Sequence, residues 1–567
     1  MTYAPENPLI VQSDMSMLLE VNSPIYEEAR DAVAPFAEII KSPEYVHTYK
    51  ITPISLWNAS SAGLNASDVM GRLERYSKYE VSHSLAVEIK DLMSRFGKFI
   101  LRNHNSGLKL SAEDPLLLTQ MFHTEDVSRY FAERIDDNSV VVDPVNRGLV
   151  KQALIKAGYP ALDMAGYRKG ARLELELKTG GSFNLRPYQA AARESFLKGG
   201  TALGGNGVIV LACGSGKTIV GISVMEQLKT HTLILCTGIT AIRQWKAELL
   251  RKTTLSEDDI GEYSGECKQL RPVTLASYQI LTHRKSREAD FTHFNTLNSQ
   301  PWGLAIYDEV HLLPAQVFRF AASLQAIRRL GLTATLVRED GREADVFSLI
   351  GPKCFDVPWK VIEKQGWIAE AQCFEIRVEI TGEARYNYVN SNNRRRFRVA
   401  SENPEKMNVI RKLLDFHKGE HIIIIGQYLD QLRRISEEFN ITLITGQTPQ
   451  DERDRVYAGF KAGEFKSIVV SSVANFAVDL PDASVAIQVS GKFGSRQEEA
   501  QRLGRILRPK LSGRHARFYT LVTADTREQD FALNRQMFLT EQGYSYNILS
   551  EDEIKEVLKG DCSGLQV

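Results

Sequence analysis

Residues 207–220 read GVIVLACGSGKTIV, and this stretch decides the fold of the chain around it. An apolar, β-branched run leads into a turn with two glycines, and the turn leads into the helical pattern TIVGISVMEQLK. Gly214 and Gly216 let the backbone curl so that successive N–H groups face one anion, and the helix adds the positive end of its dipole. The order strand, loop, helix therefore predicts a phosphate-binding loop and not an ordinary surface turn.

Two side chains of this loop have tasks that follow from their positions. Lys217 would reach the β- and γ-phosphates of a nucleoside triphosphate, and the hydroxyl of Thr218 would ligate Mg²⁺. The strict form of this loop has a glycine where this chain has Leu211, so the match is partial. The loop predicts a nucleoside triphosphate with Mg²⁺ as its ligand.

A second signal follows about 90 residues later, where Asp308-Glu309-Val310-His311 ends the apolar run Gly303–Tyr307. Asp308 can hold the Mg²⁺ shell, and Glu309 can orient and deprotonate an attacking water. A solvated acidic turn is the common alternative at the end of a strand. The phosphate loop upstream favours a pair of catalytic carboxylates.

A third signal is Gln501-x-x-Gly504-Arg505-x-x-Arg508, within the helical pattern SRQEEAQRLGRILRP. Arg505 and Arg508 are three residues apart and share one helix face. Held by one domain, such a pair could reach the γ-phosphate bound to another and stabilise charge in the transition state, as an arginine finger does. An exposed basic helix face is the alternative.

Weaker signals lie at or near expected strand ends. Gln189, in LRPYQ, could read the edge of an adenine, and Thr333-Ala-Thr335 could couple the acidic motif to movement. Gln244-Trp245, Ser277-Tyr278 and Thr445-Gly446 sit at or just beyond likely strand ends, where a track for a nucleic-acid backbone could pass. Each signal alone is more often a cap or a core contact, and their order along the chain gives them weight.

Outward from these motifs, short apolar runs alternate with helical patterns, which predicts parallel sheets covered by helices. The runs are GVIVLA, HTLILCT, VTLASYQ, GLAIYDE and RLGLTAT, then HIIIIG, ITLITG, KSIVVSS, SVAIQVS and ARFYTLV. The pattern pauses around Pro358–Gly366. We therefore predict a first sheet domain over residues 183–360 and a second sheet domain over residues 361–548.

The front of the chain has a different pattern. Residues 1–115 read as helix-rich, with amphipathic patterns in SPIYEEARDAVAPFAEIIKS and ASDVMGRLERYSKY. Residues 116–182 read as a small α+β module: a helix in VSRYFAERID, a strand in SVVVD, a helix in NRGLVKQALIKAG and a strand in ARLELELK. Residues 549–567 form an acidic tail.

The charge of the chain is balanced overall and uneven locally. The 567 residues hold 70 Lys+Arg and 70 Asp+Glu, which excludes a chain that binds nucleic acid merely by being basic throughout. Residues 1–45 carry a net charge of −6 and residues 391–412 a net charge of +5. The basic run Arg394–Arg398 could contact a phosphate backbone without sequence preference, and a solvated loop is the alternative.

Composition narrows the class further. Hydrophobic residues make up 43% of the chain, which is typical of a folded globular protein. No apolar run approaches the ~20 residues of a membrane helix, and the start MTYAPENPLI has no pattern of a secretory signal. The six scattered cysteines predict reduced thiols in a cytoplasmic protein.

Together, the motifs resemble superfamily 2 helicases. The order LRPYQ, CGSGKT, DEVH, TAT, VDLP and QRLGRILR carries the general likeness, and GLTATLVREDG, LIGPK, NPEKMNVI and GSRQEEAQRLGRILR are similar to the XPB family of DNA repair helicases. Arg338-Glu339-Asp340 matches that family's RED motif, and Arg394–Arg398 occupies the place of its thumb-like insertion. The segment NFAVDLP lacks the Gly-Asp pair that is common in relatives ahead of Asp479.

The resemblance implies an α/β fold with two tandem RecA-like motor domains, behind a helix-rich domain and a small damage-recognition-like domain. It implies an ATP- and Mg²⁺-dependent 3′-to-5′ DNA helicase acting in repair on forked DNA or single-strand/duplex junctions, with a nuclease or another repair protein as a possible partner. Residues assigned to the nucleotide are Arg186, Gln189, Gly214, Ser215, Gly216, Lys217, Thr218, Asp308, Glu309, Asp479, Gln501, Arg505 and Arg508. Residues assigned to DNA or coupling are His311, Thr333, Thr335, Arg338, Glu339, Asp340, Arg394, Arg395, Arg396 and Arg398.

Three alternatives stay open at this point. The chain could be an RNA helicase, a translocase that remodels duplex DNA without separating its strands, or a scaffold whose ATP site acts as a slow clamp on DNA. Glu309 argues against the scaffold, because a clamp needs no carboxylate to activate water.

Overall fold

The fold is described from a computed structural model. It describes residues 3–41, 45–105, 107–164, 170–178, 184–198, 205–212, 214–283, 292–313, 317, 324, 326–334, 343–357, 359–471, 483–491, 516–542, 544 and 546–554. By its contacts the chain forms two compact units. Among the described residues, one unit holds the two front modules and most of the first sheet domain, up to Asp356. The other holds Lys41, residues 212 and 214–215, and the described residues from Val357 onward. Each unit is described by itself below.

The first sheet domain is built on a parallel sheet of seven described strands in the order β12-β13-β11-β14-β15-β10-β16. Every residue of β11 and β13 is buried, as expected for strands covered on both faces. The strands are β10 (Asn206–Val210), β11 (Thr232–Cys236), β12 (Ile260–Tyr263), β13 (Val273–Ser277), β14 (Leu304–Asp308), β15 (Arg328–Thr333) and β16 (Lys353–Asp356).

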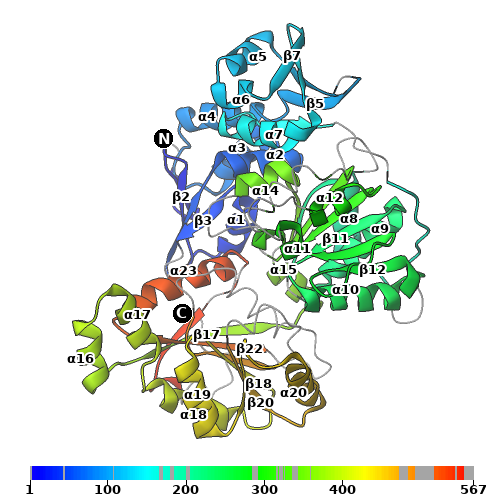
Figure 1. The fold of residues 1–567 in the computed structure, drawn as a ribbon. Coiled ribbons are helices and arrows are strands. Elements are labelled where there is room, and N and C mark those ends of the chain that lie inside the picture. Colours follow the sequence, from blue (N-terminus) through cyan, green and yellow to red (C-terminus); the bar gives the residue numbers. More distant parts are fainter. Residues whose placement is uncertain are drawn as a thin grey trace. The chain divides into compact units, whose positions relative to one another are not determined.

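Helices cover this sheet (Figure 1). They include α8 (Pro187–Leu197), α9 (Lys217–Leu228), α10 (Ile239–Lys252), α11 (Tyr278–Thr282), α12 (Thr292–Asn298) and α14 (Glu343–Leu349). Because the strands are parallel, each strand-to-helix loop leaves from the same edge of the sheet. All five strands that the sequence predicts for this domain are present.

The second sheet domain repeats this design with the strand order β19-β20-β18-β21-β22-β17-β23, again parallel throughout. Its strands are β17 (Ala371–Val378), β18 (Ile422–Gly426), β19 (Thr442–Ile444), β20 (Ser467–Ser471), β21 (Val485–Gln488), β22 (Ala516–Thr523) and β23 (Tyr546–Ser550). The prediction of two tandem parallel-sheet domains is therefore confirmed. The predicted start of the tail at residue 549 is wrong, since β23 runs to Ser550.

The helices of this domain belong to two groups. The first group comprises α15 (Trp359–Lys364), α18 (Lys406–Phe416), α19 (Leu429–Phe439), α20 (Gln450–Ala462) and α23 (Arg527–Glu541), of which α19 and α23 contact strands of the sheet. The second group is a hairpin of α16 (Gly382–Asn390) and α17 (Asn393–Ser401), which carries the basic run (Figure 1).

The N-terminal module contains more strand than its sequence suggests. A sheet of order β1-β2-β4-β3 accompanies the helices α1 (Tyr26–Val33), α2 (Pro53–Ser61), α3 (Ala66–Tyr76) and α4 (His83–Ser94). Its strands are β1 (Leu9–Val11), β2 (Ser16–Glu20), β3 (Glu38–Lys41) and β4 (Val46–Lys50). The helical pattern predicted over 23–42 splits into α1 and β3, because sheet pairing overrides a locally ambiguous apolar pattern.

The small α+β module is larger than predicted. Its sheet has the order β7-β8-β6-β5-β9, and β5 (Phe99–His104) and β6 (Gly107–Ala112) precede the predicted boundary at residue 116. That boundary is therefore wrong, because β6 pairs with both β5 and β8 (Ser139–Val142). The other elements are α5 (Pro115–Phe122), α6 (Glu125–Ser128), β7 (Phe131–Asp136), α7 (Arg147–Lys156) and β9 (Ala161–Asp163).

Two segment predictions in this module also fail in part. VSRYFAERID is not one helix: it ends the short α6 and then forms β7, which pairs with β8. ARLELELK does present Leu173, Leu175 and Leu177 to the core, but it makes only isolated bridges to Thr230 and Thr253. Its partners are the ends of helices α9 and α10, so residues 170–178 pack on the first sheet domain.

Within the first unit, α14 joins the front modules to the first sheet domain. Phe347 on α14 packs with Trp57 on α2, and the Gln152 side chain on α7 donates a 2.7 Å hydrogen bond to Asp345. In the described part of the chain, no helix combines the length and the apolar character that crossing a membrane requires. The four described cysteines carry free thiols, as predicted: Cys236, Cys267, Cys354 and Cys373.

A buried ion pair ties α18 to α23 in the second sheet domain. The Lys406 ammonium lies 2.9 Å from a Glu528 carboxylate oxygen, both side chains are 1% exposed, and Lys406 also donates to the Val489 carbonyl. Glu528 in turn accepts the Thr523 backbone N–H. Removing one member would leave the other charge buried and unpaired.

We therefore expect Glu528→Ala to lower the free energy of unfolding by about 3–5 kcal/mol. Glu438→Ala is the matched control, because Glu438 pairs with Arg411 at the surface, where both side chains are at least 40% exposed. The control should cost about 0–1 kcal/mol. Urea unfolding of the two variants measures the difference, and equal midpoints would contradict this account of the pair.

Candidate active site

The phosphate loop has the backbone that the sequence predicts. Gly214 and Gly216 adopt positive φ angles of 77° and 86°, which glycine tolerates best, and α9 starts directly after Gly216. The Ser215 hydroxyl is buried and donates to the Ala212 carbonyl at 2.6 Å, which tightens the turn. Leu211, at the position where the strict motif has glycine, is fully buried and extends the strand through a hydrogen bond to the Thr333 carbonyl.

The two carboxylates of the acidic motif make different contacts at the end of β14. Asp308 ends the strand, and Glu309 adopts a left-handed φ of 49°, which turns the chain sharply. The Lys217 ammonium lies 3.6 Å from a Glu309 carboxylate oxygen. Residues 92 positions apart in sequence thus meet, because β10 and β14 end at the same edge of the sheet.

The two carboxyl groups have opposite electrostatic environments. Burial, reinforced by the neighbouring Glu309 carboxylate, raises the pKa of Asp308 to about 6. Burial alone would also raise the pKa of Glu309, but the Lys217 ammonium and His311 hold that pKa below its ordinary value. Glu309 is therefore the more firmly ionised carboxylate of the pair.

His311 connects this motif to the next strand. Its Nδ1 lies 2.6 Å from the Thr333 hydroxyl and 3.5 Å from the second carboxylate oxygen of Glu309. His311 is 3% exposed, so the contact is shielded from bulk water. The structure thus brings together Glu309, His311 and Thr333, three of the residues that the motif order predicts.

Gln189 lies close to Gly216 of the phosphate loop. Its carbonyl oxygen accepts the Arg186 backbone N–H at 3.0 Å, and Arg186 donates through its guanidinium to the Tyr188 hydroxyl. A Cβ placed on Gly216 would come within 2.6 Å of the Gln189 amide nitrogen, so Gly216 lets these two segments approach. Thr218 is half-buried in the first turn of α9.

Trp245 and Tyr278 contradict their predicted role. Both side chains are buried, so neither lies on a nucleic-acid track. The Trp245 indole N–H donates to the Asp308 carboxylate at 2.9 Å, and the Tyr278 hydroxyl donates to the Asp308 backbone carbonyl at 2.7 Å. The prediction of a position at a strand end holds for Tyr278, which directly follows β13, and is wrong for Trp245, which lies within α10. Their shared partner was missed, because nothing local in the sequence links them to Asp308.

Several predicted residues lie outside the described residues. They are Thr335, Arg338, Glu339, Asp340, Asp479, Gln501, Arg505 and Arg508. The backbone of Arg394 is described, and its side chain is not.

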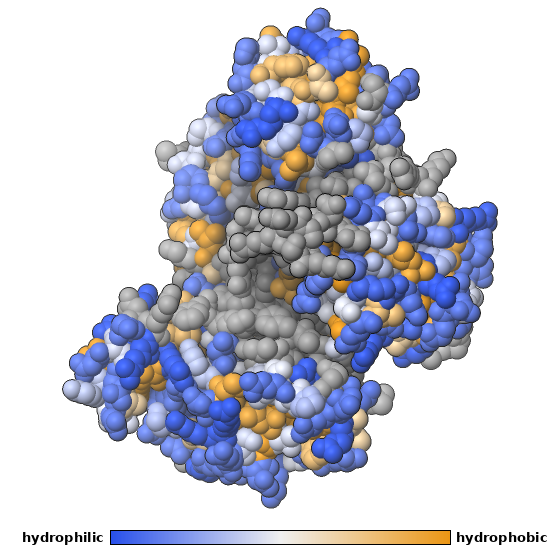
Figure 2. Space-filling model, in the orientation of Figure 1, coloured by the Kyte–Doolittle hydropathy of each residue, from blue (hydrophilic) through white to orange (hydrophobic). Residues whose placement is uncertain are grey.

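The basic run is helical, and its arginines differ in their surroundings. Arg398 forms ion pairs with Glu402 and Asp430. Arg396 donates to the carbonyls of Tyr388 and Val389, the last turn of α16, so it closes the hairpin. Arg395 is exposed. Hydrophilic residues cover most of the visible surface there (Figure 2).

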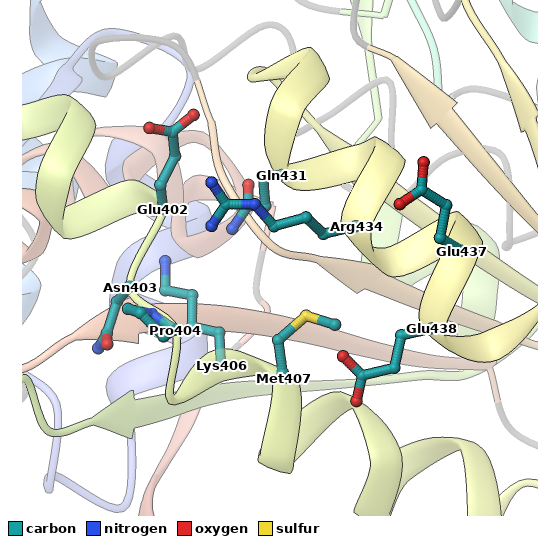
Figure 3. Close-up of a pocket in the computed structure, with 9 residues that line it drawn as sticks. All are labelled: Glu402, Asn403, Pro404, Lys406, Met407, Gln431, Arg434, Glu437 and Glu438. Carbon is teal, nitrogen blue, oxygen red and sulfur yellow. The ribbon is translucent and has the colours of Figure 1, made fainter.

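A pocket of about 510 Å³ lies in the second sheet domain, between the start of α18 and α19 (Figure 3). The Arg434 side chain extends from α19 toward Glu402 and Gln431, and Glu437 and Glu438 lie further along the same helix. None of the residues that line it was predicted as a site residue.

The residues around Lys217 suit a nucleotide with Mg²⁺. Asp308 offers the carboxylate oxygens that Mg²⁺ prefers, and Thr218 offers a hydroxyl. One Glu309 carboxylate oxygen is buried without a hydrogen-bond donor among the described residues. A buried oxygen of this kind fits the place of a water or a metal-bound ligand.

Comparison with known proteins identifies the family. Residues 362–561 match the family described as ERCC3/RAD25/XPB C-terminal helicase. Residues 9–136 match a helicase conserved C-terminal domain, and residues 182–338 match the type III restriction enzyme res subunit.

Full-length relatives agree with these matches. The chain is 49% identical to a DNA 3′-5′ helicase XPB of Kineococcus radiotolerans, with 97% of each chain covered. It is 50% identical to a DNA 3′-5′ helicase XPB of Mycobacterium tuberculosis, over 97% of this chain and 99% of that one. It is also 31% identical to the general transcription and DNA repair factor IIH helicase/translocase subunit XPB/SSL2 of Saccharomyces cerevisiae. That match covers 95% of this chain and 72% of the yeast protein.

Proposed function

This chain belongs to the XPB family of DNA helicases, and on that premise we propose that it hydrolyses ATP to move 3′-to-5′ along DNA and unwind it during repair. The observation that carries the proposal is the contact of Lys217 with Glu309 beside Asp308. These are the three charges that nucleoside triphosphate hydrolysis requires, placed at one edge of a parallel sheet.

Each residue has a part in this proposal. The N–H groups of the loop from Gly214 to Lys217 bind the phosphates, and Lys217 neutralises their charge. Thr218 and Asp308 would hold Mg²⁺, which supplies charge stabilisation on the transferred phosphoryl group. Phosphates compete with Glu309 for Lys217, and the released carboxylate can then accept the proton of the attacking water.

Coupling and the arginine finger belong to the same proposal. His311 faces both Glu309 and Thr333, so a change in the charge of Glu309 reaches the end of the adjacent strand β15. Arg505 and Arg508 would stabilise the γ-phosphate, Gln501 and Asp479 would also bind the nucleotide, and Gln189 with Arg186 would read the adenine. Thr335, the triplet Arg338–Asp340 and the run Arg394–Arg398 would transmit the step to DNA.

A second candidate is translocation along duplex DNA without strand separation. The name of the yeast relative, a helicase/translocase subunit, favours it. The substrate in either case is forked DNA or a single-strand/duplex junction, and a nuclease or another repair protein is the partner that we propose. The cytoplasm is the compartment proposed for this reaction.

The polarity of unwinding tests the proposed function directly. The two forks compared differ only in the polarity of their single-stranded tail. Because a 3′-to-5′ motor needs a 3′ tail on which to start, we expect the fork with a 3′ tail to be unwound at least tenfold faster than the fork with a 5′ tail. Gel-resolved strand separation with Mg²⁺·ATP measures it. ATP hydrolysis that DNA stimulates with no strand released would favour the translocase, and stimulation by RNA alone would contradict a DNA substrate.

The catalytic carboxylate is tested by Glu309→Gln, which keeps the shape of the side chain and removes its basicity. We expect this variant to bind ATP and to lose turnover by at least 100-fold, a barrier increase of about 2.7 kcal/mol. Lys217→Ala should lose both tight binding and hydrolysis with the fold intact. Calorimetric binding and phosphate release measure the two effects, and free hydrolysis by Glu309→Gln would require another base.

The basic hairpin is tested by comparing neighbouring arginines. Arg395→Ala should weaken unwinding of forked DNA more than basal ATP hydrolysis, and Arg395→Lys should restore it, because a phosphate contact requires charge more than shape. Arg396→Ala should instead lower the free energy of unfolding by about 1–3 kcal/mol, because it leaves helix-end carbonyls without a charged donor. Equal loss of unwinding and basal hydrolysis in Arg395→Ala would refute a role on DNA.

A further inference from the structure

Asp308 is held from two directions by side chains that the hydrolysis scheme does not use. Trp245, in the middle of α10, donates its indole N–H to the carboxylate at 2.9 Å. Tyr278, the first residue of α11, donates its hydroxyl to the backbone carbonyl at 2.7 Å. Trp245 is 1% exposed and Tyr278 is 2% exposed, so water does not compete for either hydrogen bond.

The Trp245 indole can lie beside Asp308 because Gly221, which it packs against, has no side chain. A Cβ on Gly221 would lie 2.7 Å from the far carbon of the Trp245 ring, a distance that real Cβ atoms do not show. Gly221 is on α9, the helix that begins at Lys217. Trp245 therefore touches both the helix of the phosphate loop and the carboxylate at the end of β14, so it spans the two halves of the nucleotide site.

The hydroxyl of Tyr278 binds the backbone between the two acidic residues Asp308 and Glu309. The carbonyl that it binds belongs to the peptide between Asp308 and Glu309, and Glu309 has a φ of 49°. A left-handed conformation is unfavourable for a glutamate and persists only where its surroundings fix it. The hydrogen bond from Tyr278 is one such constraint, and it keeps Glu309 directed toward Lys217.

We propose that Trp245 and Tyr278 are positioning residues, which fix Asp308 as a ligand for the Mg²⁺ of a bound nucleotide and keep Glu309 apart from that task. The inference rests on the proposed function. Trp245 donates a hydrogen bond to one carboxylate oxygen of Asp308 and so orients the other. Tyr278 fixes the peptide that joins Asp308 to Glu309. Outer-shell partners of this kind set the affinity of a site for its metal.

The test compares Trp245→Phe and Tyr278→Phe with the matched control Trp302→Phe. Trp302 is equally buried, and its indole N–H donates to the Leu297 carbonyl at 2.6 Å, away from the carboxylates. Calorimetry measures the affinity of the full chain for ATPγS with Mg²⁺ and with EDTA. We expect the Mg²⁺-dependent gain in affinity to fall by about 10-fold or more in the first two variants. The control should keep the gain of the unaltered protein, and binding in EDTA should be equal in all four proteins.

Three outcomes decide between the explanations. If Trp245→Phe and Tyr278→Phe keep the Mg²⁺-dependent gain of Trp302→Phe, the two side chains only fill the core and the positioning role is refuted. If the unaltered protein itself shows no Mg²⁺-dependent binding, the proposed function fails first. If Trp245→Phe does not fold, Tyr278→Phe, which removes a single oxygen atom, still decides the question.

Discussion

The alignment of the parallel strand ends in the first sheet domain is the constraint on which the rest of the site depends. Along the sheet, β13, β11, β14, β15 and β10 are neighbours in that order. Tyr278 directly follows β13, Asp308 ends β14, and Thr333 ends β15. Lys217 follows the loop after β10. One edge of one sheet therefore gathers Lys217, Asp308, Tyr278 and Thr333, although the chain supplies them from segments far apart.

Burial gives this arrangement its chemistry. Within the sheet edge a carboxylate cannot rely on water for stabilisation, so its ionisation depends on its neighbours. Glu309 has Lys217 and His311 beside it and stays ionised, whereas Asp308 has Glu309 beside it and is harder to ionise. A bound cation would remove that penalty for Asp308. Two adjacent residues of like charge thus suit two different tasks, one as ligand and one as base.

Contacts of α14 and of residues 170–178 explain why the front modules belong to one unit with the first sheet domain. The helix α14 directly precedes the strand β16 and packs on α7 and α2 through Phe347 and Asp345. Residues 170–178 add their backbone hydrogen bonds at the ends of α9 and α10. The N-terminal modules therefore contact the first sheet domain through α14.

The sequence by itself determined both parallel sheets, the phosphate loop, the acidic pair and the helicase family, because apolar runs and motif spacing are local properties of the chain. It did not place β5 and β6 in the small module or separate β7 from α6, since sheet pairing is non-local. It also missed the partnership of Asp308 with Trp245, 63 residues away, and with Tyr278, 30 residues away. Only the tertiary structure decided those contacts, because the order of strands in a sheet, and not their order in the chain, decides which side chains meet.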